Sequence, residues 1–178
     1  MNPEIIVSEE LIFAGRDVNL AVRQAQLQNG LVVQREIIHS YGAVLIVPVT
    51  SNNEVRLVRQ FRPAAGKWLI ELPAGGLEAG EDPDLAAPRE LLEETGDRAA
   101  TWHRLHGFYS APGVFTEFLH LYLATGLTPG PNSLEVDEHI EVLTIPWAEA
   151  MAMIGRHEIE DAKTIAGLMQ AGLYLKLI

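Results

Sequence analysis

Cysteine is absent from this chain of 178 residues. Its absence excludes disulfide frameworks, thiolate nucleophiles, Cys-ligated zinc and iron–sulfur clusters, and we expect a cytoplasmic protein. Basic residues are also scarce, because 13 Lys and Arg accompany 24 Asp and Glu and give a formal net charge of -11. A sequence-independent grip on DNA or RNA needs a basic face, so no nucleic-acid partner is expected.

Long hydrophobic runs are missing as well. The longest run, Ala43 to Val49, contains Pro48, and it is far shorter than the roughly 20 residues of a membrane-spanning helix. Residues 1–14 carry three glutamates and no basic residue, which fits no targeting segment. We therefore expect neither membrane association nor a cleaved leader. The chain also lacks a Walker loop, a nucleophile elbow, a dinucleotide fingerprint and a His-Glu-x-x-His pattern.

Apolar residues make up 48% of the chain, which is enough for one compact domain with a small appendage. Apolar and polar residues alternate in three stretches within residues 4–38, and the last two stretches are joined by the hairpin dipeptide Asn29-Gly30. This pattern predicts a small antiparallel sheet. We expect residues 1–40 to form this three-stranded subdomain and residues 41–178 to form the main domain. The main domain's pattern predicts an α/β sandwich with strands at 43–49, 55–61, 68–72, 102–109, 117–124 and 140–145 and closing helices at 147–154 and 162–175.

A glycine-rich segment and a further helix lie within the main domain. Residues 73–81 contain three glycines, and we expect no regular element there. Asp82 or Asp84 can cap the helix that follows, which stops at Gly96. Pro88 would cost on the order of 3 kcal/mol inside a helix. We therefore expect the regular helix to begin only near Leu85 or to be kinked at the proline.

Acidic side chains are concentrated in residues 71–96, where eight acids accompany one base, Arg89. On a helix, Glu90, Glu93 and Glu94 share one edge and repel each other by roughly 0.2–0.5 kcal/mol per pair. A divalent cation would offset this repulsion, and carboxylate oxygens without His or Cys favour Mg²⁺ or Mn²⁺. Taken alone, the cluster is also typical of a solvated helix face.

The spacing around the acidic cluster matches a family motif. The segment resembles the Nudix box, Gly-x5-Glu-x7-Arg-Glu-U-x-Glu-Glu-x-Gly-U with U apolar. Its fixed positions are occupied by Gly75, Glu81, Arg89, Glu90, Glu93, Glu94 and Gly96. Leu91 supplies one apolar position, whereas the last one holds Asp97. The resemblance implies an α/β/α sandwich with a mixed sheet and a metal-dependent pyrophosphohydrolase.

The resemblance also implies a role for each box residue. The metal ligands would be Glu90 and Glu94, with Glu93 assisting and the backbone carbonyl of Ala74 as a further ligand. Glycine next to that carbonyl lets it approach an ion without a side chain in the way. The supporting residues would be Arg89, which orients a glutamate, Glu81, which buttresses the loop, and the structural glycines Gly75 and Gly96.

Features outside the box are similar to the ADP-ribose pyrophosphatase branch of the family. They are the segments Arg35 to His39, Val58 to Arg62 and Glu71 to Gly75, and Pro112 sixteen residues after Gly96. The resemblance implies hydrolysis of a nucleotide sugar, ADP-ribose, to AMP and ribose 5-phosphate, with Mg²⁺ or Mn²⁺ as cofactor. It further implies a homodimer, because members of the branch dock their N-terminal sheets across the partner subunit.

Substrate-binding residues follow from the same resemblance. Arg35 and Arg62 match arginines that bind phosphate or the terminal ribose, with Arg35 acting in the neighbouring subunit. Pro112 and Glu117 also match the branch and are expected to lie at the substrate-binding site. Ser110 would supply the hydroxyl that relatives often carry at the next position, where this chain has alanine.

The general base is expected in a later acidic loop. By resemblance it is Glu138 or, as second choice, Glu135, and Asp137 is the other acid of that loop. A side chain on a mobile loop can take a proton from water once the substrate is bound. For each of these residues a solvated surface acid is the alternative.

Aromatic residues are few, at 7% of the chain, and they do not single out an adenine site. Phe13, Phe108, Tyr109 and Phe115 are possible stacking partners. The tryptophans, Trp68, Trp102 and Trp147, are assigned to packing.

Two other functions stay open. A broader nucleoside-diphosphate-sugar hydrolase, acting on UDP-glucose or GDP-mannose, would carry the same box, because specificity depends on pocket groups outside it. A non-catalytic module that senses ADP-ribose is the second alternative. The presence of every charged box residue favours an enzyme.

Overall fold

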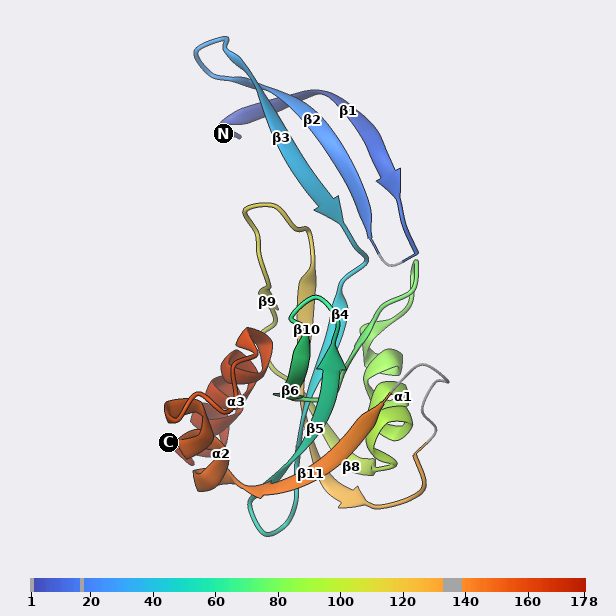
Figure 1. Cartoon of the computed structure of the whole chain (residues 1–178), viewed down its shortest axis with the longest axis vertical. Coiled ribbons are helices and arrows are strands. Elements are labelled where there is room, and N and C mark those ends of the chain that lie inside the picture. The colour runs from blue at the N-terminus through green and yellow to red at the C-terminus, as the bar shows by residue number, and fades with distance from the viewer. Residues whose placement is uncertain (1, 17, 133–138) are drawn as a thin grey trace.

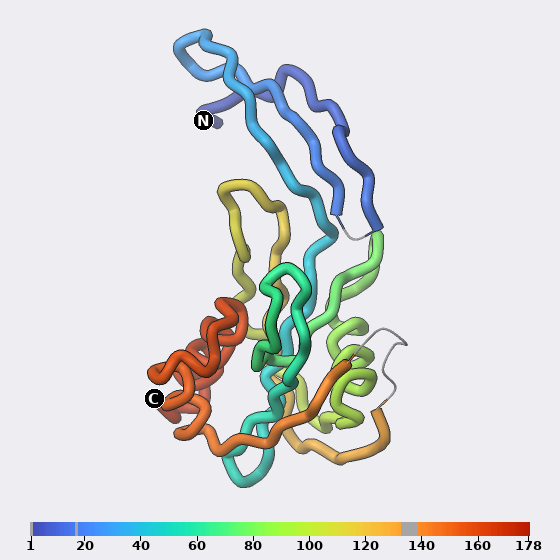
Figure 2. The backbone as a smooth tube through the Cα atoms, viewed as in Figure 1, coloured from blue at the N-terminus to red at the C-terminus, as the bar shows by residue number. Residues whose placement is uncertain are grey.

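The computed structural model describes residues 2–16, 18–132 and 139–178. A small sheet projects from one end of a larger body (Figures 1 and 2). The body combines a mixed sheet with helices on both of its faces. None of the helices in the described ranges is long and apolar enough to cross a membrane.

The small sheet is an antiparallel meander. Its strands are β1 (Glu4–Ala14), β2 (Asn19–Leu27) and β3 (Val32–His39). The turn between β2 and β3 uses Gly30 at φ +85°, a conformation that glycine adopts without a steric penalty. Backbone hydrogen bonds join β3 to the body, from Ile38 N to Val114 O at 2.7 Å and from Thr116 N to Ile38 O at 2.9 Å.

The main sheet is mixed. Its strands are β4 (Ala43–Val49), β5 (Glu54–Arg62), β6 (Lys67–Glu71), β7 (Ala74–Gly76), β8 (Arg98–Arg104), β9 (Phe108–Tyr109), β10 (Phe118–Thr128) and β11 (Ile140–Pro146). The central order is β11-β5-β4-β10-β8, with β6 beside β5, β7 beside β4 and β9 beside β10. β4 and β10 run parallel, and the other paired strands run antiparallel.

Helices cover both faces of the main sheet (Figure 1). They are α1 (Pro83–Thr95) on one face and α2 (Trp147–Gly155) and α3 (Ala162–Leu175) on the other. β4 is buried along its whole length. Its side chains alternate, so that Leu45 and Val47 join the core beside α2 and α3 while Val44 and Ile46 join the core beside α1. The predicted α/β/α sandwich with a mixed sheet and a separate three-stranded antiparallel sheet is confirmed.

The helix α1 begins earlier than expected. Its N-cap is Asp82, whose carboxylate accepts a hydrogen bond from Asp84 N at 3.0 Å. Pro83 follows at the first helical position, where its missing N–H costs nothing. The expected start near Leu85 is therefore wrong. Pro88 lies inside the helix on its exposed side, where water can satisfy the carbonyl that the proline leaves unpaired.

Two further expectations are wrong. Residues 73–81 are not irregular throughout, because β7 pairs with β4 in the register Ala43 to Gly76. The strand expected at 102–109 is instead β8, which starts directly after α1, and the separate short strand β9. Trp68, which was assigned to packing, does pack edge-to-face on Phe61, with ring centroids 5.9 Å apart, although it stays 44% exposed.

Candidate functional site

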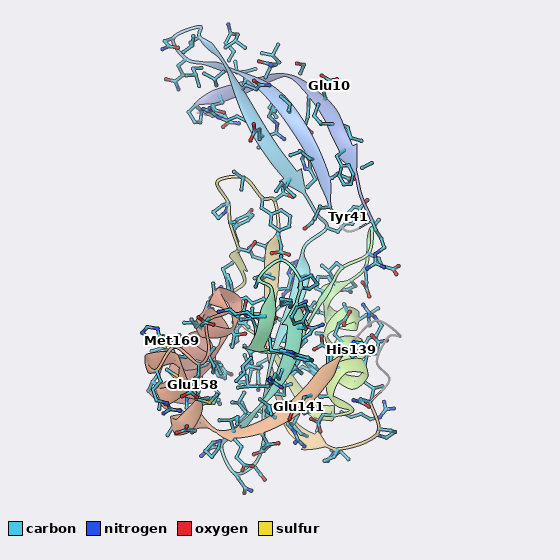
Figure 3. All side chains as sticks on the ribbon, in the orientation of Figure 1. Glu10, Tyr41, His139, Glu141, Glu158 and Met169 are labelled. Atoms are coloured by element: carbon cyan, nitrogen blue, oxygen red, sulfur yellow. The ribbon has the colours of Figure 1, made fainter. Side chains whose placement is uncertain are left out.

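A cavity of about 760 Å³ opens beside β7 and α1. The β1–β2 turn, the linker between the two sheets, β5 and the segment before β10 complete its wall, and Figure 3 shows Tyr41 at the junction of the small sheet and the body. A smaller hollow of about 270 Å³ on another side of α1 contains none of the box residues. The charged groups that line the larger cavity are Glu78, Glu90, Glu93, Glu94, Glu117, Arg16, Arg62 and Arg89.

The strand β7 brings the backbone of the box against α1. A Cβ atom added to Gly75 would lie 1.9 Å from Glu90 Cδ, so only glycine leaves room for the Glu90 carboxylate at this place. Ala74 N donates a hydrogen bond to Glu94 Oε2 at 3.2 Å. Glu94 is only 3% exposed. Two carboxylates from successive turns of α1 therefore meet the same short strand at the cavity wall.

Arg89 joins the acids of the box to one another. Its Nη1 donates to Glu90 Oε1 at 2.7 Å and to Glu93 Oε2 at 3.0 Å, and its Nη2 donates to Glu81 Oε1 at 2.9 Å. Burial disfavours the charged guanidinium, but the hydrogen bond to Glu81 and the charge of Glu90 outweigh it and raise the pKa of Arg89. The backbone N–H of Glu78 and then Arg89 lower the pKa of Glu81. Glu81 is thus an ionised support for Arg89.

The donor set fits a hard divalent cation. Within the described ranges, no three His, Asp or Glu side chains already converge as a metal cage, because Arg89 draws Glu90 and Glu93 while Glu94 accepts from the Ala74 backbone. Glu90 and Glu94 nevertheless line the same cavity, and the missing Cβ of Gly75 leaves the space that the Glu90 carboxylate occupies. Carboxylate and carbonyl oxygens are the ligands that Mg²⁺ and Mn²⁺ prefer.

The end of α1 is fixed by Gly96 and Asp97. Gly96 has φ +74°, and a Cβ atom there would lie 2.2 Å from Gly130 O, so both conformation and space require glycine. Asp97 occupies the last apolar position of the box and is 1% exposed. Its carboxylate lies 3.0 Å from Arg56 Nε, and Arg56 also donates a hydrogen bond to Thr144. An ion pair between the buried Asp97 and the partly buried Arg56 therefore replaces the apolar contact expected from the motif.

The structure brings only some of the predicted substrate residues to the cavity. Arg62 and Glu117 line it. Ser110 and Pro112 are exposed and do not belong to its lining. Arg35 lies on β3, where its Nη2 donates to Glu4 Oε1 at 2.6 Å. The candidate bases Glu135, Asp137 and Glu138 lie outside the described residues.

Several cavity residues were not predicted from the sequence. Gln60 is one, and its Oε1 is buried without a hydrogen-bond partner among the described residues. Its position two residues before Arg62 on a strand could have indicated that both side chains share a face. Arg16 and Tyr41 also line the cavity, but no local signal connects the turn and the linker that carry them with the box.

In this α/β/α sandwich the glycine-containing strand β7 packs against the helix α1, which carries Glu90, Glu93 and Glu94 of the box. This arrangement is that of a Nudix-type hydrolase domain. Residues 39–168 match the family model of the NUDIX domain. The chain therefore belongs to the Nudix family, which confirms the resemblance drawn from the box. Nudix hydrolases generally depend on divalent metal ions.

Several known proteins are similar to the chain over most of its length. It is 38% identical to the methanol dehydrogenase activator of Bacillus methanolicus, covering 98% of this chain and 93% of that protein. It is 37% identical to the ADP-ribose pyrophosphatase of Bacillus subtilis (strain 168), covering 90% and 88%. It is 34% identical to the GDP-mannose pyrophosphatase of Escherichia coli (strain K12), covering 70% and 69%.

The fold is also shared with a solved structure. The crystal structure of an ADP compounds hydrolase matches with a TM-score of 0.88 at 22% sequence identity, covering 99% of this chain and 96% of that chain. At this identity the likeness concerns the fold. Because almost the whole chain is covered, the shared fold includes the small N-terminal sheet.

Proposed function

We propose that the protein hydrolyses the diphosphate of ADP-ribose to AMP and ribose 5-phosphate. Water would add to one phosphorus while the bridging P–O bond breaks, so that each product keeps one phosphate. The observation that carries the proposal is the contact between Gly75 and Glu90 beside the buried Glu94, at the wall of a cavity of about 760 Å³. The similarity to an ADP-ribose pyrophosphatase over 90% of the chain supports the choice of substrate.

The cofactor in this proposal is Mg²⁺ or Mn²⁺. Glu90 and Glu94 would hold it, with Glu93 and the carbonyl of Ala74 as further ligands. A bound divalent ion polarises the P–O bond, neutralises phosphate charge and lowers the pKa of water. Such neutralisation explains how a chain with a net charge of -11 could accept an anionic substrate.

The remaining roles belong to residues of this chain. Arg89 orients Glu90 and Glu93 through its hydrogen bonds at 2.7 and 3.0 Å. Arg62 would bind the diphosphate, because a guanidinium matches two phosphate oxygens at once. Glu117 lines the cavity and would contact the sugar. Glu138, or Glu135 as second choice, would take the proton of the attacking water.

We also propose a homodimer that buries the N-terminal sheet. Large apolar side chains of this sheet and of its β2–β3 turn are more than half exposed, namely Ile5, Ile6, Val7, Leu11, Ile12, Phe13 and Leu31. An exposed apolar surface of this kind is typical of an interface. Arg35 would then reach the partner's cavity. Sedimentation at micromolar concentration should give about twice the chain mass of 19.6 kDa, and a single species of the chain mass would contradict the dimer.

A substrate panel tests the proposed reaction. ADP-ribose, UDP-glucose, GDP-mannose and diadenosine polyphosphates are incubated with the protein and Mg²⁺, and the released phosphomonoesters are identified. We expect AMP and ribose 5-phosphate from ADP-ribose, and no turnover after chelation with EDTA. Cleavage of only the sugar-free polyphosphates would contradict the assignment. Binding of ADP-ribose without turnover would instead support the sensor alternative.

A broader nucleoside-diphosphate-sugar hydrolase is the second candidate. The similarity to a GDP-mannose pyrophosphatase favours it. The absence of Pro112 from the cavity lining favours it too, because Pro112 is one of the features that implied ADP-ribose as the substrate. In the panel, a kcat/KM for GDP-mannose or UDP-glucose above that for ADP-ribose would select this candidate.

A further inference from the structure

Glu71 is a buried acid with no part in the proposed reaction. It lies at the end of β6 with its side chain 1% exposed, and it does not line the cavity. Burial of a carboxylate costs free energy unless cations and hydrogen bonds compensate for it. Burial accordingly opposes ionisation of Glu71, but the hydrogen bond from Arg62 and the charge of Lys163 outweigh it and lower the pKa of Glu71.

The contact between Glu71 and Arg62 is bidentate. Arg62 Nε donates to Glu71 Oε1 at 2.8 Å, and Arg62 Nη2 donates to Glu71 Oε2 at 2.7 Å. Two parallel hydrogen bonds fix the plane of a guanidinium as well as its position. Nη1 takes no part in this contact, and Arg62 lines the cavity with 38% of its side chain exposed. One edge of the guanidinium is therefore held by Glu71 while the group as a whole faces the cavity.

The negative charges around Arg62 explain why its guanidinium needs the bidentate contact with Glu71. Five of the glutamates that the structure describes line the cavity, including Glu90 and Glu94 of the box. The hydrogen bond to Glu71 raises the pKa of Arg62 against the effect of burial, and the charge of Glu94 adds to this. A guanidinium without its anchor would be drawn toward the carboxylates that the proposed metal ion needs. Glu71 therefore keeps the phosphate-binding guanidinium of Arg62 away from the carboxylates that would bind the metal ion.

The start of α3 holds Glu71 in turn. Lys163 Nζ lies 2.5 Å from Glu71 Oε2 and 3.0 Å from the carboxylate of Asp161, the N-cap of α3. Thr164 Oγ1 accepts a hydrogen bond from Leu72 N at 2.8 Å and donates one to Asp161 Oδ2 at 2.6 Å. The carboxylate of Glu71 is thus fixed from β5 and from α3 together.

We infer that Glu71 is a positioning residue for substrate binding, which orients Arg62 so that its guanidinium meets the diphosphate of the nucleotide sugar. The inference rests on the proposed hydrolysis of a nucleoside-diphosphate sugar. Glu71 acts through Arg62 and does not itself contact the substrate. Loss of its charge should therefore weaken substrate binding by the same amount as loss of Arg62, and through the same step.

Steady-state kinetics on ADP-ribose with saturating Mg²⁺ test the inference through a double-mutant cycle. Arg62→Ala and Glu71→Gln should each raise KM roughly tenfold, the equivalent of one charge-assisted hydrogen bond. Both should leave kcat within about threefold, because neither residue holds the metal ion or the attacking water. In the double variant, KM should also be raised only about tenfold over the wild type. The control Arg59→Ala, on the same strand but outside the cavity lining, should match the wild type.

Separate additive effects, near a hundredfold in the double variant, would contradict the inference, as would a wild-type KM in Glu71→Gln. Should Glu71→Gln fail to fold, Arg62→Lys keeps the ion pair but lacks the planar fork, and it should still raise KM roughly tenfold. A wild-type KM for Arg62→Lys would overturn the inference. If the panel selects another nucleotide sugar, the same ratios are measured on that compound, so a wrong substrate and a wrong role for Glu71 give different results.

Discussion

Gly75→Ala should inactivate the enzyme without unfolding it. The added Cβ atom would lie 1.9 Å from Glu90 Cδ and 2.1 and 2.2 Å from its two carboxylate oxygens. Ordinary van der Waals contact begins near 3.4 Å, so the carboxylate has to move by about 1.5 Å. A misplacement of about 1 Å can cost about a hundredfold in rate. We therefore expect kcat/KM to fall at least about a hundredfold, which corresponds to about 2.7 kcal/mol in the activation free energy.

The neighbouring glycine is a matched control. Gly76 lies on the same strand β7, and a Cβ atom added there meets nothing within 4 Å. Gly76→Ala should therefore keep kcat/KM within about twofold of the wild type, and both variants should melt within a few degrees of it. The assay is AMP release from ADP-ribose with Mg²⁺, together with a thermal melt. Full activity in Gly75→Ala, or equal losses in both variants, would refute the reasoning.

Glu94→Gln should lower turnover by about 10²–10³-fold, because it removes a proposed metal ligand. The near-ultraviolet circular dichroism spectrum should stay unchanged, because glutamine keeps the shape of the side chain. Turnover within threefold of the wild type would contradict this role. Asp97→Ala should lower the free energy of unfolding by about 3 kcal/mol in urea, since it removes the carboxylate that pairs with Arg56, whereas Asp97→Leu with Arg56→Met should recover most of it. An additive loss would be evidence against the pair. Because the folded pKa of Glu71 is lowered, its ionised form stabilises the fold above its unfolded pKa near 4.5 and this contribution disappears as the pH falls below that value. The melting temperature should therefore fall more steeply below pH 4.5 in the wild type than in Glu71→Gln, and parallel curves would contradict the assignment.

The parts of the fold that local patterns determine could be predicted from the sequence. The helix expected at 162–175 has those bounds in the structure, because its apolar spacing and the capping Asp161 are both local signals. The hairpin dipeptide Asn29-Gly30 marked the turn between β2 and β3 for the same reason. The box was readable because seven residue types recur at fixed distances along a loop and one helix.

Features that depend on distant partners could not be predicted. β7 is a strand only because β4 pairs with it, and a glycine-rich sequence has no strand propensity of its own. The burial of Asp97 depends on Arg56, which lies 41 residues away. Arg62 was predicted as a phosphate ligand, but no local signal indicated its bidentate contact with Glu71, because the register of β5 and β6 places Val58 opposite Glu71. In each case the missing information is which distant segments come together.

Binding of Mn²⁺, followed by the electron paramagnetic resonance signal of the free ion, tests most directly whether the box carboxylates hold a metal ion. The wild type should bind Mn²⁺ saturably. Glu90→Gln and Glu94→Gln should each weaken binding at least about tenfold, and Glu141→Gln, an exposed acid on β11, should leave it unchanged. Undiminished binding in both box variants would contradict the account.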